Sequence, residues 1–410
     1  MVATDTLIPK GMRGLLIAGL AHLALTGAAQ SQEREPAKAT SPGAKTNDYG
    51  TPITSAKEKV GLQSIAFRLG LYSKDDSGDG TSAGNPFLDE DLTVIQPSMI
   101  MDWGLDDVSA LSVTAQYDWV SSASIERLSD RTTFPGTQQS GASGDFYVGL
   151  DVAYRRQLNN GMRGGGHVGF GKEYDYLSVG LGGDLAWEGP DRNSTYSASL
   201  NGYFDSVDLI RFNGVETGSD NRTSLAGTFK WNRVLDSASS MQLGATVSNQ
   251  SGFLGTPYNS VFIDEVGGLR EVNEVLPDSR MRYSFYGSYR RWIMDGGAAE
   301  IATRIYNDDW GIFGLSLEPR WYQQVGENLL MRFRYRYYDQ SAADSFGLFT
   351  TEEAFMTQDS ELGDFNSHTI GVRIIGYRDG LQGWDAGLDY VMRSDELDHI
   401  VASAGYLWTF

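Results

Sequence analysis

The feature that most constrains this chain is an alternation of apolar and polar residues that recurs from Leu62 to the last residue. Residues 329–338 show it most clearly, because apolar and aromatic residues there alternate with Arg332, Arg334 and Arg336. A period of two belongs to a β-strand with one apolar and one polar face, whereas a helix repeats about every 3.6 residues. The pattern therefore predicts an all-β protein built of half-buried strands.

Turn-forming residues divide this pattern into about sixteen segments, an even number, and each is long enough to cross a bilayer at a tilt. The expected strands are residues 62–73, 92–103, 109–121, 144–158, 162–173, 177–188, 194–205, 222–234, 240–250, 280–293, 298–307, 311–324, 329–338, 366–378, 384–393 and 399–410. Cysteine is absent, so no disulfide framework supports these strands.

Short and long connections between these segments alternate along the chain. The short links are residues 104–107, 159–161, 189–191, 235–237, 295–297, 326–328 and 379–380. The long links between them include residues 74–91, 122–143, 206–221, 251–279 and 339–365. A soluble sandwich has no reason to sort its loops in this way. We therefore predict a transmembrane antiparallel up-and-down β-barrel with short periplasmic turns and long extracellular loops.

The N-terminal residues predict export. Residues 1–31 have the features of a signal peptide, with basic residues before an apolar run and small residues after it, and Met12 is a possible true start. The apolar run is about half the length that a spanning helix needs. Residues 32–60 are polar and aperiodic, which predicts a flexible periplasmic leader, and residues 61–410 form the barrel. We expect the mature chain in the outer membrane of a Gram-negative cell.

The last strand ends the sequence on an aromatic residue. Every second residue from Ile400 to Phe410 is apolar or aromatic. This strand resembles the C-terminal strand that outer-membrane barrels present to their assembly machinery, where an exposed apolar edge pairs with another sheet. The expected partners are therefore the barrel assembly machinery, through Phe410, together with outer-membrane lipid and lipopolysaccharide. The oligomeric state stays open.

The polar faces of the strands, which line the inside of such a barrel, carry charges in two groups. The basic group consists of Arg282, Arg304, Arg320, Arg332, Arg334, Arg336 and Arg373. The acidic group consists of Asp118, Asp151, Asp184 and Asp205. In a ring of about sixteen strands the two groups lie on nearly opposite arcs. Two interpretations remain open: a transverse electric field across the lumen, or ion pairs between neighbouring strands that stiffen the wall.

These charges predict a passive channel for small polar or anionic solutes. The formal net charge of -20 argues against nucleic acid as a partner, because phosphate binding requires a basic surface. The alternative function is a non-conducting barrel that acts as a scaffold or anchor for a periplasmic or surface partner. In that alternative the pore is closed by residues 251–279.

The link 251–279 is rich in apolar residues for a connection between strands. A fully solvated loop would not carry so many of them. We predict that it folds inward as a constriction or plug, with packing onto a partner protein as the rival explanation.

The sequence gives little support for an enzymatic function. The few histidines show no metal-ligand spacing, so we expect no metal site, no cofactor and no catalytic residues. His368 beside Ser367 is the only candidate for an enzyme at the barrel rim. We therefore expect no enzymatic activity.

One stretch resembles a known family. Residues 255–292 resemble the hallmark of an uncharacterised bacterial outer-membrane barrel family that carries a domain of unknown function. The matching residues are Pro257, Tyr258, Glu274, Pro277, Arg280 and Arg282. A second, weaker match lies at residues 117–128, where this sequence lacks the glycine of the family's turn. The resemblance implies the barrel fold and adds no activity.

Overall fold

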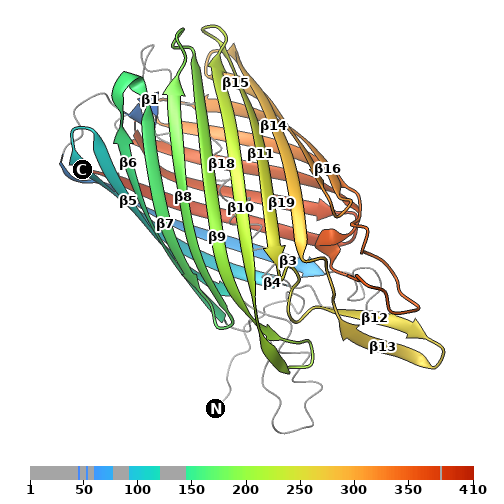
Figure 1. Cartoon of the computed structure of the whole chain (residues 1–410). Helices are drawn as coiled ribbons and strands as arrows, with labels where there is room; N and C mark the ends of the chain where they lie inside the picture. Colours follow the sequence, from blue (N-terminus) through green and yellow to red (C-terminus); the bar gives the residue numbers. More distant parts are fainter. Residues whose placement is uncertain (1–44, 47–51, 54–59, 77–91, 121–144, 379–380) are drawn as a thin grey trace, which may run out of the picture.

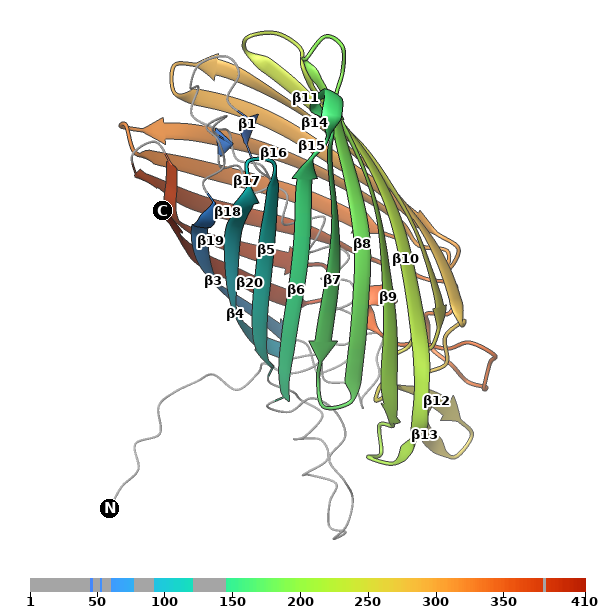
Figure 2. The ribbon, with the colours of Figure 1, turned by 60° about the vertical axis from the view of Figure 1, so that its left-hand side comes forward.

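The computed structural model describes residues 45–46, 52–53, 60–76, 92–120, 145–378 and 381–410, and its main element is a closed antiparallel barrel (Figures 1 and 2). The sixteen barrel strands are β3 (Gly61–Asp76), β4 (Leu92–Asp106), β5 (Ser109–Val120), β6 (Asp145–Gln157), β7 (Arg163–Lys172), β8 (Tyr176–Glu188), β9 (Ser194–Ile210), β10 (Glu216–Val234), β11 (Ser239–Gly252), β14 (Ser279–Met294), β15 (Gly297–Asp308), β16 (Phe313–Val325), β17 (Leu329–Gln340), β18 (Phe365–Arg378), β19 (Leu381–Arg393) and β20 (Leu397–Thr409). The predicted fold class and strand number are confirmed.

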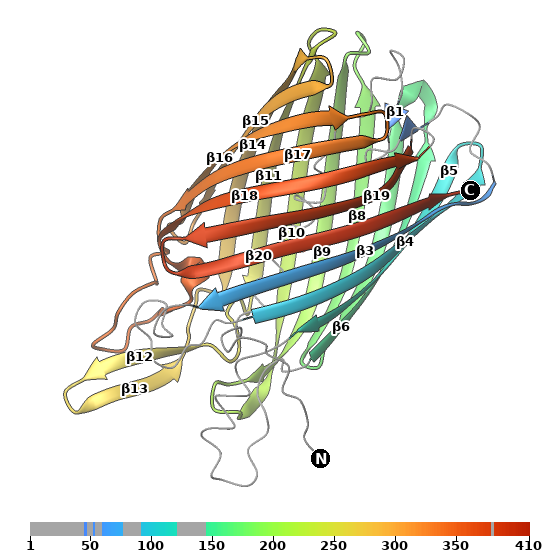
Figure 3. The same ribbon diagram turned by 180° about the vertical axis from the view of Figure 1, so that it is seen from behind.

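Each barrel strand pairs with its neighbour in sequence, except where a hairpin is inserted between β11 and β14. The ring closes where β20 pairs with β3, with Ala404 opposite Leu69 (Figure 3). Beyond that pairing the backbone N–H of Phe410 donates to the carbonyl of Gln63 at 2.9 Å. The alternating C-terminal strand is therefore the element that seals the barrel.

The two faces of the strands are sorted as the alternation predicts. On β6, Val148 and Leu150 are 52% and 47% exposed on the outside of the barrel, a surface that suits lipid. On β17, Phe333 is 45% exposed on the same outer face, whereas Arg332 points inward and is 5% exposed. Apolar side chains therefore cover the exterior and polar side chains the interior.

The two rims of the barrel differ as expected. The turns on the rim that holds the C-terminus are short, and two of them use Gly296 and Gly326 at φ +69° and +66°, where a residue with a Cβ would be strained. The other rim carries the long connections. The link predicted at 206–221 is an exception, because β9 and β10 extend beyond the expected bounds and leave only residues 211–215 between them.

Several expected segments fall outside the described residues. They are the signal peptide, most of the leader, most of link 74–91, the whole of link 122–143 and link 379–380. Of the leader, β1 (Lys45–Thr46) pairs with β2 (Pro52–Ile53). The helical turns η2 (Asn159–Gly161) and η3 (Ser360–Leu362) have three residues each, and the described chain has no helix with the length and apolar character that crossing a membrane requires.

The prediction that residues 251–279 fold into the barrel is wrong. Their central part forms a hairpin of β12 (Ser260–Glu265) and β13 (Gly268–Asn273) that extends beyond the end of the barrel (Figures 1 and 3). The apolar side chains Val261 and Ile263 are buried against Phe349 in the link between β17 and β18. A second loop of the same chain, which the sequence pattern does not identify as a partner, therefore covers them.

Candidate functional site in the barrel interior

All seven arginines of the predicted basic group lie on the inward face of β14 to β18. The strand register brings some of them together, since Arg320 stands opposite Arg334 and Arg332 stands opposite Arg373. Like charges at directly opposite positions repel each other unless counter-charges lie between them. The positions of the neighbouring carboxylates therefore decide whether these arginines repel each other.

A chain of ion pairs compensates the arginine charges in the middle of the wall. Arg320 donates to Glu300 on β15 at 2.9 Å and to Glu318 on its own strand at 2.7 Å. Arg334 lies 3.5 Å from Glu318 and 2.8 Å from Asp389 on β19. Carboxylates therefore alternate with guanidinium groups across five neighbouring strands, β15 to β19.

A second network joins strands that are not adjacent. Asp385 on β19 binds Arg373 on β18 at 2.8 Å and Arg68 on β3 at 3.1 Å. The Asp385 side chain is only 3% exposed, so both arginines meet a carboxylate that is shielded from solvent. Arg373, Arg320 and Arg334 thus each pair with a carboxylate on a neighbouring strand, as considered from the sequence. The contacts of Arg68 with Asp385 and of Arg334 with Asp389 instead join next-nearest strands.

Glycine makes the contacts between next-nearest strands possible. Gly371 lies on β18 between Arg334 and Asp389, and a Cβ built on it would overlap the Asp389 carboxylate and lie 2.9 Å from Cγ of Arg334. Gly405 on β20 has the corresponding place in the second network, with 3.0 Å between its hypothetical Cβ and Oδ1 of Asp385. Inward glycines therefore act as gaps across which charged side chains pair.

Other arginines of the wall lie against aromatic rings. The guanidinium carbon of Arg336 is 5.1 Å from the ring centre of Tyr338, and that of Arg304 is 5.9 Å from the ring centre of Tyr286. On the inward faces of β14 to β19 as a whole, arginines outnumber carboxylates. The arginines are Arg280, Arg282, Arg290, Arg304, Arg320, Arg332, Arg334, Arg336, Arg373 and Arg393, and the carboxylates are Glu300, Asp308, Glu318, Asp385 and Asp389.

The predicted acidic group lies on the inward face of the opposite wall, where β5 to β9 stand across the ring from β15 to β18 (Figure 2). Asp118 is fully buried and accepts hydrogen bonds from Gln96 at 3.1 Å and Gln116 at 3.0 Å. Asp205 accepts from Nε of Arg222 at 2.9 Å. This arginine, which the prediction did not include, neutralises part of the acidic wall.

The centre of the acidic wall carries a histidine between two acceptors. Nδ1 of His167 lies 2.8 Å from Asp151, and Nε2 lies 3.0 Å from the side-chain oxygen of Asn201 on β9. Gly182 on β8 leaves the space through which this second contact runs, because a Cβ there would overlap both side chains. Asp184, two residues further along β8, is exposed on the same inward face.

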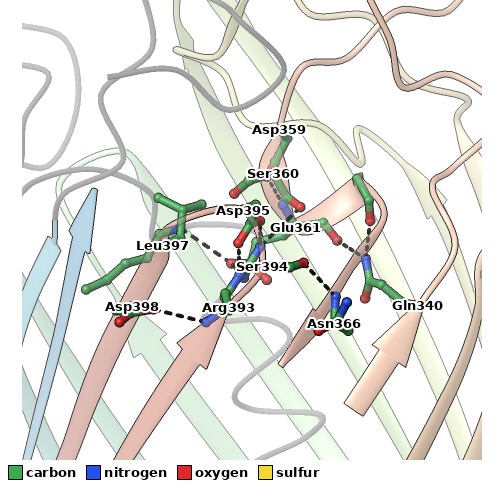
Figure 4. A network of polar contacts seen from close by, with 12 residues as sticks. Gln340, Asp359, Ser360, Glu361, Asn366, Arg393, Ser394, Asp395, Leu397 and Asp398 are labelled. Atoms are coloured by element: carbon green, nitrogen blue, oxygen red, sulfur yellow. Dashed lines mark hydrogen bonds and ion pairs between the residues drawn. The ribbon is translucent and has the colours of Figure 1, made fainter. Parts of the chain in front are cut away.

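The segment that folds over the interior is the link between β17 and β18. Its turn η3 places Glu361 against two inward-facing cations, Arg393 of β19 at 2.7 Å and Lys74 of β3 at 3.4 Å. Figure 4 shows the side of this contact that Arg393 forms. The backbone of η3 is fixed by Asp359, whose side chain accepts from the N–H of Glu361 at 2.9 Å. The sequence predicts only a long extracellular loop for residues 339–365, and their pattern gives no signal of an inward position.

The charge state of Glu361 follows from these neighbours. Partial desolvation by the surrounding loop and strands raises the pKa of this half-exposed carboxyl group, but the charges of Arg393 and Lys74 lower it by more. The pKa of Glu361 is therefore well below its ordinary range. We therefore expect the contacts of Glu361 with Arg393 and Lys74 to weaken only as the pH falls well below the ordinary pKa of a glutamate.

A second carboxyl group joins the two long loops of this rim. Glu274, between β13 and β14, accepts hydrogen bonds from the hydroxyl of Thr357 at 2.5 Å and from the backbone N–H of Thr256 at 3.2 Å. Burial raises the pKa of Glu274 above its ordinary value, and the two hydrogen bonds oppose this only in part. Glu274 is one of the residues by which the chain resembles a known family, so this motif position is a contact between loops.

The remaining motif residues lie in the same region. Pro257 is buried, and Tyr258 and Pro277 are half-buried. Arg280 pairs with Asp308, and its guanidinium carbon lies 4.2 Å from the ring centre of Trp310. The motif therefore positions the loops above the barrel, and of its members only Arg280 and Arg282 belong to a barrel strand.

The raised pKa of Glu274 predicts that the docking of the two loops depends on pH. Because the docked state favours the protonated carboxyl, docking is strongest in acid and weakens as the pH rises through and above the ordinary value of 4.5. Spin labels on cysteines at the exposed positions Val266 and Leu348 report the distance between the loops. We expect a narrower distance distribution at pH 5 than at pH 8.

The variant Glu274→Gln supplies the control for this prediction, because it removes the titrating group and keeps the shape of the side chain. In that variant the distributions at the two pH values should coincide. A pH dependence that survives the substitution would assign the effect to another group.

His368 and Ser367, the only candidates for a rim enzyme, point to opposite faces of β18. The ring of His368 lies outside, 2.7 Å from the Tyr335 hydroxyl and beside the ring of Tyr337, whereas Ser367 is buried on the inward face. The two side chains are therefore not brought together. Among the described residues no group of three or more His, Asp or Glu side chains is placed to hold a metal ion.

Comparison with known proteins gives a family and several similar folds. No curated protein matches the sequence at a significant level. The siderophore receptor PirA from Pseudomonas aeruginosa is 10% identical, with a TM-score of 0.41 over 82% of this chain and 56% of the receptor. A bacterial polysaccharide outer membrane secretin is 9% identical, with a TM-score of 0.46 over 84% of this chain and 98% of the secretin.

A mutant of the ferric enterobactin receptor PfeA from Pseudomonas aeruginosa is 12% identical, with a TM-score of 0.45 over 82% of this chain and 54% of the receptor. The chain thus spans about half the length of the receptors that it matches. A family model described as "Protein of unknown function (DUF3570)" matches residues 18–409, nearly the whole sequence. The chain belongs to this DUF3570 family of proteins of unknown function.

Proposed function

We propose that the protein is a channel in the bacterial outer membrane that passes small polar solutes and favours anions. The observation that supports this most directly is the surplus of arginines over carboxylates on the inward faces of β14 to β19. Fixed charges on a pore wall raise the local concentration of ions of opposite sign and thereby set selectivity. A barrel of this strand number is wide enough to hold water beyond its inward side chains.

The opposite wall supports the same proposal. Asp184 on β8 is exposed and faces the interior on that side. A basic wall and an acidic wall on opposite sides produce a field across the pore, which orients dipolar solutes and disfavours apolar ones. The pairing within the basic wall reduces this field without removing it, because the arginines remain in excess.

The test is the ion selectivity of the purified barrel in planar bilayers. Replacing Arg336 by glutamine removes one charge from the basic wall at a residue that packs on Tyr338. At about 0.1 M salt, where screening lengths are about 10 Å, we expect the ratio of anion to cation permeability to fall about twofold. Reversal potentials in a salt gradient measure this ratio.

Arg233→Gln is the matched control, because Arg233 lies at the end of β10 and pairs with Asp191 at the rim, with both side chains more than 40% exposed. This variant should keep the selectivity of the original protein. An unchanged selectivity in Arg336→Gln would contradict the role given to the basic wall.

The alternative, a non-conducting scaffold, is favoured by one observation. The two long loops build a compact structure beyond the barrel, with Val261, Ile263, Phe349 and Met356 buried in a cluster of their own. Such a structure offers a partner a preformed surface. A barrel that inserts into bilayers and shows no conductance steps would support the scaffold and overturn the channel.

A further inference from the structure

Two buried cations converge on a single carboxylate at the mouth of the barrel. The side chains of Lys74 and Arg393 are each 2% exposed, whereas that of Glu361 is 43% exposed. The cations belong to the barrel strands β3 and β19, and the carboxylate belongs to a loop. Figure 4 shows Arg393 and Glu361 at this contact. The two sides of this contact therefore differ in both burial and anchoring.

The cation side is held in place independently of Glu361. The guanidinium carbon of Arg393 lies 3.6 Å from the ring centre of Phe365, and its Nε donates to Asp395 at 2.9 Å. Lys74 is fixed in the strand register opposite His399 of β20. These contacts lie within or next to the barrel strands, so they remain when η3 moves.

The carboxylate side is the part that can be exchanged. Glu361 is the exposed member of this contact, so an anion reaches the two buried cations by taking its place. When Glu361 leaves, Lys74 and Arg393 lose the carboxylate that they share, and the loss of a counter-charge is unfavourable for buried cations. An incoming anion that takes the place of Glu361 therefore favours the exchange.

We propose that Lys74 and Arg393 form a binding site for the carboxylate or phosphate group of an anionic solute, which the chain fills with its own Glu361 until the solute displaces it and loosens η3. A guanidinium group and an ammonium group suit an oxyanion with two accessible oxygens. The inference rests on the proposed function only in that the ligand is a solute of the channel.

The reporter for this exchange is a single cysteine. The backbone N–H of Ala343 donates to the carbonyl of Leu362, next to Glu361, at 2.8 Å, and both side chains lie in one buried cluster. Because the chain has no cysteine of its own, Ala343→Cys introduces a unique thiol through a small change. Its rate of reaction with a small neutral thiol reagent measures how often η3 separates from the cluster.

The probe is inorganic phosphate, added to the protein in detergent at constant pH. We expect phosphate to accelerate labelling of Ala343→Cys about tenfold with saturation, and chloride at equal ionic strength to have no such effect. Introducing Glu361→Gln into the Ala343→Cys protein should make labelling of the cysteine fast even without phosphate. Introducing Lys74→Gln into the Ala343→Cys protein should raise the half-saturating phosphate concentration about tenfold. Heat-dependent migration in gels checks that this double variant is folded.

Equal acceleration by chloride and phosphate would overturn the proposal, because it would show charge screening in place of binding. The absence of any phosphate effect would overturn it as well, even if Glu361→Gln labels rapidly. The measurement requires no ion flow, so a positive result together with silence in bilayers would reject the channel and keep the binding site.

Discussion

Replacing Arg320 by glutamine is expected to lower the free energy of unfolding by about 3–5 kcal/mol. The guanidinium group lies between Glu300 and Glu318, and the three side chains are between 3% and 9% exposed. Removing the cation leaves two shielded carboxylates with one counter-charge fewer, although Arg290 still pairs with Glu300 and Arg334 lies 3.5 Å from Glu318. The penalty comes from this loss of counter-charge at buried carboxylates, which is larger than the net gain from forming the pair.

Unfolding by guanidinium chloride in lipid vesicles, followed by tryptophan fluorescence, measures this loss. Arg233→Gln again serves as the comparison, since its partner Asp191 is 3.6 Å away and both side chains are well exposed. Exposed pairs of this kind contribute about 0–1 kcal/mol. Similar losses in the two variants would show that the interior is wet enough to screen the Arg320 cluster.

The strands and their faces were predictable because alternation is a local property of the sequence. Val148 and Leu150 lie outside and Arg332 lies inside, as the period of two requires. The opposition of β6 and β16 follows from strand order alone once the ring has closed. The same alternation places the seven arginines and four aspartates of the candidate site on inward faces, and their role as the lining of a pore stays a prediction.

The partners of these charges were not predictable, because they depend on contacts between residues that are far apart in the sequence. Asp385 meets Arg68 only because the barrel closes between β20 and β3 and a glycine on β20 leaves the space. The loops show the same limit. Apolar residues in 251–279 indicated burial correctly, but nothing in their pattern indicated that Phe349 would cover them.

The role of glycine as a gap leads to the second large effect. Replacing Gly371 by alanine is expected to cost about 2 kcal/mol, because the added methyl group occupies the space in which Arg334 and Asp389 meet. Either side chain can swing away, but the hydrogen bond of 2.8 Å between them is then lost. Hydrogen bonds between charged groups contribute about 1.5–3 kcal/mol each.

Gly387→Ala tests whether the loss of stability in Gly371→Ala comes from filling the space between the ion pair or from replacing any inward glycine. Gly387 also faces inward, on β19, but its hypothetical Cβ would lie 3.4 Å from Oγ of Ser403 and 3.5 Å from Cγ of Arg373, which is close to an ordinary packing distance. Here the reduced freedom of the unfolded chain should leave stability unchanged or raise it by about 0.4–1 kcal/mol. If both variants lose stability equally, the glycines serve strand curvature, and the ion pairs across them are incidental to it.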